Sequence, residues 1–284
     1  MTKPWIFRVA VAATAVLTAP CVAETGNVSD EEIAKQRAML AATTDRAGFG
    51  PQSPRDIEQV SGENTRAFGR APERDEMTLC DIHFHENAEH KGGQFTEYAG
   101  NGDGKGNGTG FKYTGALTEA ELTPYKSRVA ESEHGDLIPG DTIEIHFVFS
   151  TAQANLGNGL GTCFTDAISN PQLRVEAVVG VLVNDPTAVD FTEMAAIETV
   201  NGQHQVPNLP DTLGTPVSYA GSTTGPSFNE AASPFQVTWN VRPNVIKLNI
   251  ASLAAWLADN PFEESHAHGV RNLVINPLLL SDIN

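Results

Sequence analysis

The chain has 284 residues, of which 35 are Asp or Glu and 18 are Lys or Arg, so its net charge is −17 at pH 7. This length is enough for one large domain with a substantial core or for two small ones. The negative charge disfavours nucleic acid and anionic membrane surfaces as partners, because both repel an acidic protein.

The first 23 residues have the layout of a secretory signal peptide. Lys3 and Arg8 precede an apolar stretch over residues 9–19, and small residues follow up to Ala23, after which we expect cleavage. Cleavage would take the net charge to −19 and place the mature protein in the periplasm or outside the cell. The apolar stretch is too short to span a bilayer and no later run is long enough, so membrane insertion is not expected.

Residues 24–75 are predicted to form a polar arm that wraps the rest of the chain. This arm contains one short helix, over residues 30–42, which begins at a cap formed by Ser29 or Asp30. Residues 76–284 are then expected to form the single folded domain.

The segment over residues 80–90, Cys-Asp-Ile-His-Phe-His-Glu-Asn-Ala-Glu-His, predicts a metal site in strand geometry. Side chains alternate faces along a strand, so His83 and His85 point to the same side. The apolar strand predicted over residues 142–150 supplies His146 as a third ligand from the neighbouring ladder. A lone buried histidine is usually a hydrogen-bonded core residue, but burying three imidazoles without a common partner is costly. Three histidines with a fourth position open are typical of a catalytic zinc.

Two acidic residues are placed to support these ligands. Asp81 lies two residues before His83, and Glu144 lies two residues before His146, so each shares a strand face with its histidine. A carboxylate in this position accepts the ring N–H of the ligand, fixes its tautomer and raises its basicity.

The cysteines predict a disulfide. Cys80 and Cys163 are the only two left after cleavage, and export places them where a disulfide is the default. Cys80 is disfavoured as a thiolate ligand, because a position three residues before His83 lies on the opposite face of a regular strand. Cys21 falls inside the signal peptide and follows a proline, which makes it a poor site for lipid attachment.

The remaining pattern favours a mostly β single domain. Glycine dominates residues 92–115, where we expect a mobile loop, since the spacing of its acids does not match an EF-hand. Short apolar strands are predicted over residues 142–150, 172–183, 235–241 and 273–280, and a helix over residues 250–257. The predicted fold is a central, largely antiparallel sheet with short peripheral helices.

Taken together, these motifs resemble the carbonic anhydrases, in particular the δ class and its bacterial relatives, with active-site motifs of the α class. The resemblance rests on residues 81–90 and 144–149, and on Tyr-Ala-Gly-Ser-Thr-Thr-Gly-Pro over residues 219–226, which is similar to the family's Y-P-G-S-L-T-T-P. Val-Thr-Trp over residues 237–239 also matches. The motifs occur in the family's order, which is harder to obtain by chance than any one of them.

The resemblance implies an α-carbonic-anhydrase-like catalytic domain over residues 76–284. It also implies zinc-dependent, reversible hydration of carbon dioxide to bicarbonate and a proton, through attack by zinc hydroxide held on His83, His85 and His146. Thr224 would be the gatekeeper that accepts a hydrogen bond from this hydroxide and donates one to Glu89.

The resemblance also assigns the substrate pocket, which Val148, Val178 and Trp239 would line. Thr223 departs from the family, which has a leucine of the pocket wall there, and Gly225 replaces a second threonine.

The proton-shuttle residue is left open by the sequence. No histidine precedes His83, so the usual shuttle of the α class has no counterpart. The candidates are buffer acting directly and five histidines: His90, His134, His204, His266 and His268. The last two also have the spacing of a second metal site, but their surroundings favour an exposed loop.

Two other functions remain as alternatives. A cupin-type iron or manganese dioxygenase or isomerase would use His83, His85, Glu89 and His146 as ligands. It explains nothing after His146, whereas the carbonic anhydrase motifs continue to Trp239. A non-enzymatic binding or zinc-storage module is disfavoured, because inactive relatives typically lose a metal histidine and none is missing here.

Overall fold

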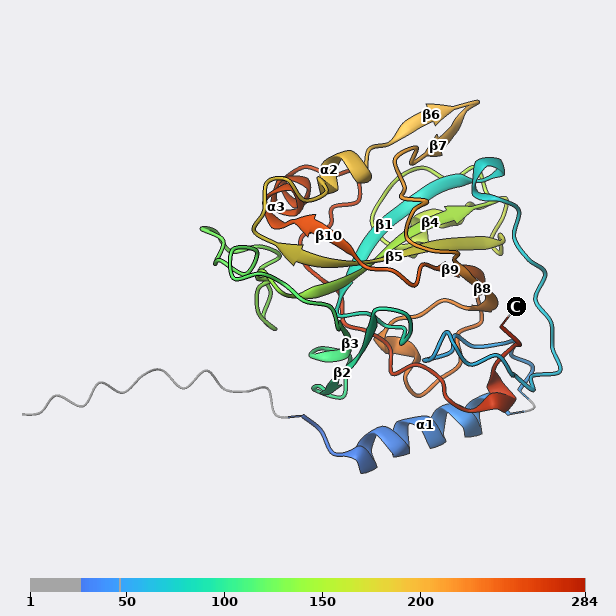
Figure 1. Ribbon diagram of the computed structural model, residues 1–284. Coiled ribbons are helices and arrows are strands. Elements are labelled where there is room, and N and C mark those ends of the chain that lie inside the picture. The colour runs from blue at the N-terminus through green and yellow to red at the C-terminus, as the bar shows by residue number, and fades with distance from the viewer. Residues whose placement is uncertain (1–26, 46, 284) are drawn as a thin grey trace, which may run out of the picture.

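The computed structural model describes residues 27–45 and 47–283 (Figure 1). The predicted signal peptide therefore lies outside the described residues. Within them, no helix is both long and apolar enough to cross a membrane.

A single mixed sheet organises the chain (Figure 1). Its strands follow the order β1-β4-β5-β9-β8, and β10 also pairs with β5. The bounds are β1 (Thr78–Glu86), β4 (Thr142–Ser150), β5 (Leu173–Val183), β8 (Val217–Ser222), β9 (Gln236–Val241) and β10 (Ile246–Asn249). Three pairings are antiparallel, and the two that join β5 to β9 and β10 are parallel. The mostly β, largely antiparallel fold is confirmed.

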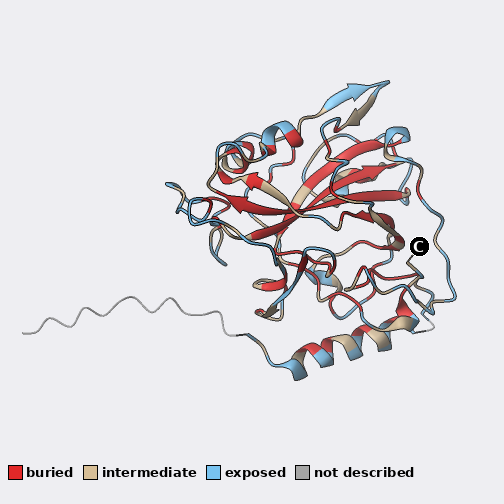
Figure 2. Ribbon diagram, viewed as in Figure 1, coloured by how far each residue is buried: buried red, intermediate tan, exposed pale blue. Residues whose placement is uncertain are grey.

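Each face of this sheet packs against its own apolar cluster. Figure 2 shows that burial is concentrated in the central strands, and every residue of β4 and β5 is buried. One cluster includes Phe84, Val178 and residues of two helices, α2 (Phe191–Met194) and α3 (Ile250–Ala258). The other includes Val148 and Trp239. The predicted ligand histidines lie on the face of the second cluster, because they alternate with residues of the first along β1 and β4.

The glycine-rich segment is a hairpin, so the prediction of a mobile loop was wrong. It contains β2 (Phe95–Asn101) and β3 (Thr109–Tyr113), which pair antiparallel. Phe95 and Phe111 are buried in the second cluster, and this anchors both strands. The glycines between the strands adopt positive φ, and the Asp103 carboxylate accepts hydrogen bonds from Asn107 across the turn.

The prediction of a strand over residues 273–280 was also wrong. That segment makes an isolated bridge from Val274 to Pro54 and then a 3₁₀ turn, η4 (Pro277–Leu279). Pro277 lacks an N–H for a ladder. Leu279 and Leu280 are buried instead against Leu40 of α1 (Asp30–Thr44), which begins at the predicted Ser29 cap. The helix of the polar arm thus packs on the C-terminal segment.

Several shorter elements complete the fold. A small hairpin of β6 (Glu198–Val200) and β7 (Gln203–Gln205) pairs outside the main sheet. Three further 3₁₀ turns are η1 (Arg74–Glu76), η2 (Leu160–Cys163) and η3 (Pro226–Phe228).

A register shift in β1 changes the position of Cys80. Leu79 pairs with Phe149 and Asp81 pairs with Val148, so Cys80 is an extra residue in the ladder. Cys80 consequently packs in the same cluster as Val148, not on the opposite face as a regular strand would require. It forms the predicted disulfide with Cys163, with a Cα–Cα distance of 5.1 Å.

Candidate metal centre

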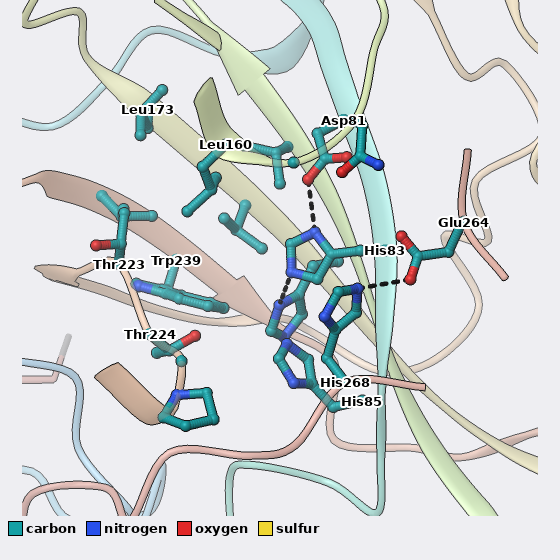
Figure 3. A pocket seen from close by; sticks show the side chains of 18 residues that line it. Asp81, His83, His85, Leu160, Leu173, Thr223, Thr224, Trp239, Glu264 and His268 are labelled. Atoms are coloured by element: carbon teal, nitrogen blue, oxygen red, sulfur yellow. Dashed lines mark hydrogen bonds and ion pairs between the residues drawn. The ribbon is translucent and has the colours of Figure 1, made fainter. Parts of the chain in front are cut away.

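Three histidines converge on one point at the sheet surface. His83 of β1 and His146 of β4 are direct cross-strand partners, and His85 lies opposite Glu144. One ring nitrogen from each of His83, His85 and His146 lies within 4.8 Å of the others. All three line one pocket, in which Figure 3 shows His83 and His85 close together. The three side chains therefore converge, as predicted.

The hydrogen bonds of these rings fix which nitrogen each presents. His83 Nδ1 donates to Asp81 at 2.7 Å, His85 Nδ1 donates to the Gly269 carbonyl at 3.0 Å, and His146 Nε2 donates to Glu144 at 3.1 Å. The other nitrogens carry lone pairs. Asp81 and Glu144 therefore occupy the predicted supporting positions.

The lone pairs of these rings face one another. His83 Nε2 lies 3.2 Å from His146 Nδ1, and His85 Nε2 is buried without a hydrogen-bond partner among the described residues. Such an arrangement is repulsive unless a positive charge, a metal ion or a proton, lies between the rings. Three imidazoles, two of them supported by carboxylates, are a donor set that fits zinc.

Electrostatics keep part of this set neutral. Burial, and then the neighbouring His146 and His83, hold the pKa of His85 well below its usual range. Burial also lowers the pKa of His146, although the Glu144 carboxylate opposes the effect. A neutral imidazole is the form that binds a metal.

Glu144 is the centre of a buried network behind His146. Its Oε1 accepts hydrogen bonds from His146 and, at 2.7 Å, from His90 Nδ1. His90 Nε2 in turn lies 2.6 Å from the Tyr219 hydroxyl. His90 is fully buried. Burial lowers the pKa of His90, but the neighbouring Glu144 carboxylate outweighs this effect, so the pKa is raised. His90 thus lies behind the ligands and does not line the pocket.

Glu89 is buried beside His146, whereas Thr224 lines the pocket. Glu89 is 2% exposed, and its Oε1 accepts the backbone N–H of Arg271 at 3.1 Å. Its Oε2 lies 4.0 Å from His146 Nε2, the nitrogen that faces away from the convergence point, and has no hydrogen-bond partner among the described residues. Thr224 lines the pocket, but no hydrogen bond joins it to Glu89 within the part of the chain described. Glu89 is also absent from the cluster of possible ligands found there.

The pocket has an apolar wall and a volume of about 210 Å³. Val148 and Trp239 line it, as predicted, together with Val175 and Val237. Val178 does not, and its assignment to the wall was wrong. Strand alternation points Val178 into the cluster on the opposite face, and Val175, three residues earlier in β5, faces the pocket.

A second acid, Glu264, and a fourth histidine, His268, line the pocket; the sequence offered His268 as one of five shuttle candidates and gave Glu264 no role. His268 Nε2 is 2.6 Å from the Glu264 carboxylate, and the His268 side chain is 44% exposed (Figure 3). His268 is exposed, as expected, but it also lines the pocket, whereas His134, His204 and His266 do not. The only sequence signal was the His-x-His spacing. A backbone bond from His268 N to the Phe84 carbonyl, which spacing does not reveal, brings this loop beside β1.

A family model for delta carbonic anhydrases matches residues 74–252. The chain belongs to the delta carbonic anhydrase family. No curated protein sequence matches it.

Two solved structures are similar to the chain. An α-carbonic anhydrase from Thermovibrio ammonificans in complex with sulfanilamide is 13% identical, with 78% of this chain and 83% of that chain covered and a TM-score of 0.25. An α-carbonic anhydrase from Photobacterium profundum is 16% identical, with coverage of 80% and 89% and the same TM-score of 0.25.

Proposed function

We propose that this carbonic anhydrase hydrates carbon dioxide with a zinc ion held by His83, His85 and His146. The proposal is supported most directly by three ring nitrogens that face one another. Two of these nitrogens are 3.2 Å apart, and the third is buried without a hydrogen-bond partner among the described residues. When bound, zinc acts as a Lewis acid and makes water a nucleophile near neutral pH.

The chain contributes substrate placement. Val148, Val175 and Trp239 form an apolar surface beside the histidines, which suits an uncharged, linear molecule such as carbon dioxide. Bicarbonate carries a charge that this wall does not solvate, so the wall favours release of the product.

Thr224 and Glu89 are proposed to orient the nucleophile. Thr224 lines the pocket beside the histidines, and its hydroxyl is able to accept one hydrogen bond and donate another. The unpartnered Glu89 Oε2 is an acceptor for the donated proton, and the bond between them would form when the site is loaded.

The supporting carboxylates have a separate task. Asp81 and Glu144 hold the ring orientations of His83 and His146, and by accepting their N–H groups they raise the basicity of the nitrogens opposite.

The same site weighs against the cupin alternative. In that reading Glu89 binds the metal directly. Glu89 instead lies beside His146 Nε2, which already donates to Glu144, and its Oε1 is occupied by the Arg271 N–H.

Export and domain organisation complete the proposal. We propose cleavage after Ala23, a polar arm over residues 24–75 and a catalytic domain over residues 76–284, in a periplasmic or secreted protein. The Cys80–Cys163 disulfide supports an oxidising compartment.

Zinc reconstitution tests the function. Protein stripped with a chelator is expected to regain carbon dioxide hydration, followed with a pH indicator, in proportion to added zinc up to one ion per chain. Full zinc loading without hydration above the buffer rate would contradict the proposal.

A further inference from the structure

Thr223 replaces the family's pocket-wall leucine, and its hydroxyl is already hydrogen-bonded to another side chain. Its hydroxyl forms a hydrogen bond with the Ser233 hydroxyl, and the residue is only 2% exposed. Although Thr223 lines the pocket, it offers less apolar surface there than a leucine would. An apolar side chain from another segment would restore the apolar area that Thr223 does not supply.

Leu160 occupies such a position. It lines the pocket and packs against the cluster that contains Val148, Val175 and Trp239. Figure 3 shows Leu160 near Leu173 and, in this view, above Trp239. Leu160 is the first residue of η2, far in sequence from Thr223, so the two reach the pocket from different loops.

The loop that carries Leu160 is anchored on one residue of β1. The N–H of Gly157 donates to the Cys80 carbonyl at 3.4 Å. The Thr162 hydroxyl is closest to the Gly159 carbonyl, at 2.8 Å, and also lies 3.2 Å from the Cys80 carbonyl oxygen. Cys163 is bonded to the Cys80 side chain. The Gly157 hydrogen bond and the disulfide lie on either side of Leu160 along the chain, and both lead to Cys80.

Cys80 is also the extra residue that sets the local register of β1. It directly precedes Asp81, which accepts the ring N–H of His83. The disulfide therefore joins the loop that bears Leu160 to the strand that bears two of the three histidines.

We propose that Leu160 supplies the missing leucine of the carbon dioxide wall and that the Cys80–Cys163 disulfide is the device that positions it. This inference rests on the proposed function. Leu160 is a specificity-determining residue, and the two cysteines act through it without touching substrate.

The first test is Leu160→Ala, with Leu278→Ala as the matched control because Leu278 is 60% exposed and lies outside the pocket. Losing part of an apolar wall weakens capture of an apolar substrate, so kcat/KM for carbon dioxide is expected to fall about threefold to tenfold. The value of kcat and the zinc content should stay unchanged, and Leu160→Met should restore most of kcat/KM. Leu278→Ala should match the wild type.

The second test removes the tether. In Cys80→Ala/Cys163→Ala, amide hydrogen exchange across residues 157–163 should accelerate at least tenfold, and kcat/KM should fall as in Leu160→Ala. Leu160→Ala should lower kcat/KM less in this double-cysteine variant than in the wild type, because both changes remove the same wall contact. Thr162→Val, which keeps the disulfide and removes the hydroxyl that contacts the Gly159 and Cys80 carbonyls, should give a smaller increase in exchange and serves if the cysteine variant does not fold.

The outcomes separate this inference from the proposed function. Zinc-loaded wild type that fails to hydrate carbon dioxide overturns both. An active wild type with an unchanged kcat/KM in Leu160→Ala overturns only the role of Leu160. Unchanged exchange across residues 157–163 after removal of the tether overturns the role of the disulfide.

Discussion

At the scale of single residues, we propose that Thr224 and Glu89 orient the nucleophile of this centre. Glu89 is buried behind His146 with one oxygen unpartnered among the described residues, and Thr224 stands on the pocket side. Neither belongs to the histidine cluster. Their proposed effect is therefore on rate and not on metal affinity.

Thr224→Ala is expected to keep its zinc and to lose about two orders of magnitude in hydration rate, the usual effect of removing one positioned hydrogen bond. Glu89→Gln should reproduce the loss with the metal retained. Zinc content and kcat/KM measured on the same preparations check both. If Glu89→Gln loses the metal while Thr224→Ala remains fully active, Glu89 is a ligand and the cupin reading is correct.

Several site residues could be predicted because strand alternation alone places them. His83 and His85, and the carboxylates of Asp81 and Glu144, follow from a period of two residues. Val178 shows where a motif match fails, because the matched segment placed it on the wrong face of β5. Glu264 and His268 could not be placed, since a backbone hydrogen bond to β1 brings their loop to the pocket.

At the scale of elements, the extra residue in β1 is the same residue that forms the disulfide, Cys80. A regular strand would point Cys80 away from the histidines, and the register shift turns it toward Cys163. No feature of the sequence predicts this shift. The β2–β3 hairpin was missed for a related reason, because its glycines form a tight turn between two strands that Phe95 and Phe111 anchor in the core.

The Cys80–Cys163 disulfide is expected to contribute about 4 kcal/mol to the free energy of unfolding, since it closes a loop with a sequence separation of 83 residues. Cys80→Ala/Cys163→Ala should lose about that amount in equilibrium denaturation. Thiol titration of the denatured, unreduced mature protein should find no free thiol. Two reactive thiols per chain would contradict the bond.

At the scale of the whole molecule, the acidic charge and the proposed export belong together. Removing residues 1–23 deletes Lys3 and Arg8 and no acid, which makes a protein of net charge −17 more acidic still. The polar arm contains α1, whose Leu40 packs against Leu279 and Leu280. Secretion would thus leave the described fold intact.

Expression of the full chain in a bacterium should yield a periplasmic or secreted product whose N-terminal residue is Glu24. Intact mass and N-terminal sequencing of that product check the cleavage site. A product that keeps residues 1–23 and stays in the cytoplasm would contradict export.

The most direct test of the metal centre is the zinc content of its histidine variants. Wild type should hold one zinc per chain. His83→Ala, His85→Ala and His146→Ala should each lose most of it together with hydration, because two imidazoles cannot hold the ion as three do. His90→Ala, which removes a histidine that contacts Glu144 from behind the site, should retain the metal. Full zinc occupancy in the three ligand variants, or equal loss in His90→Ala, would contradict the assignment.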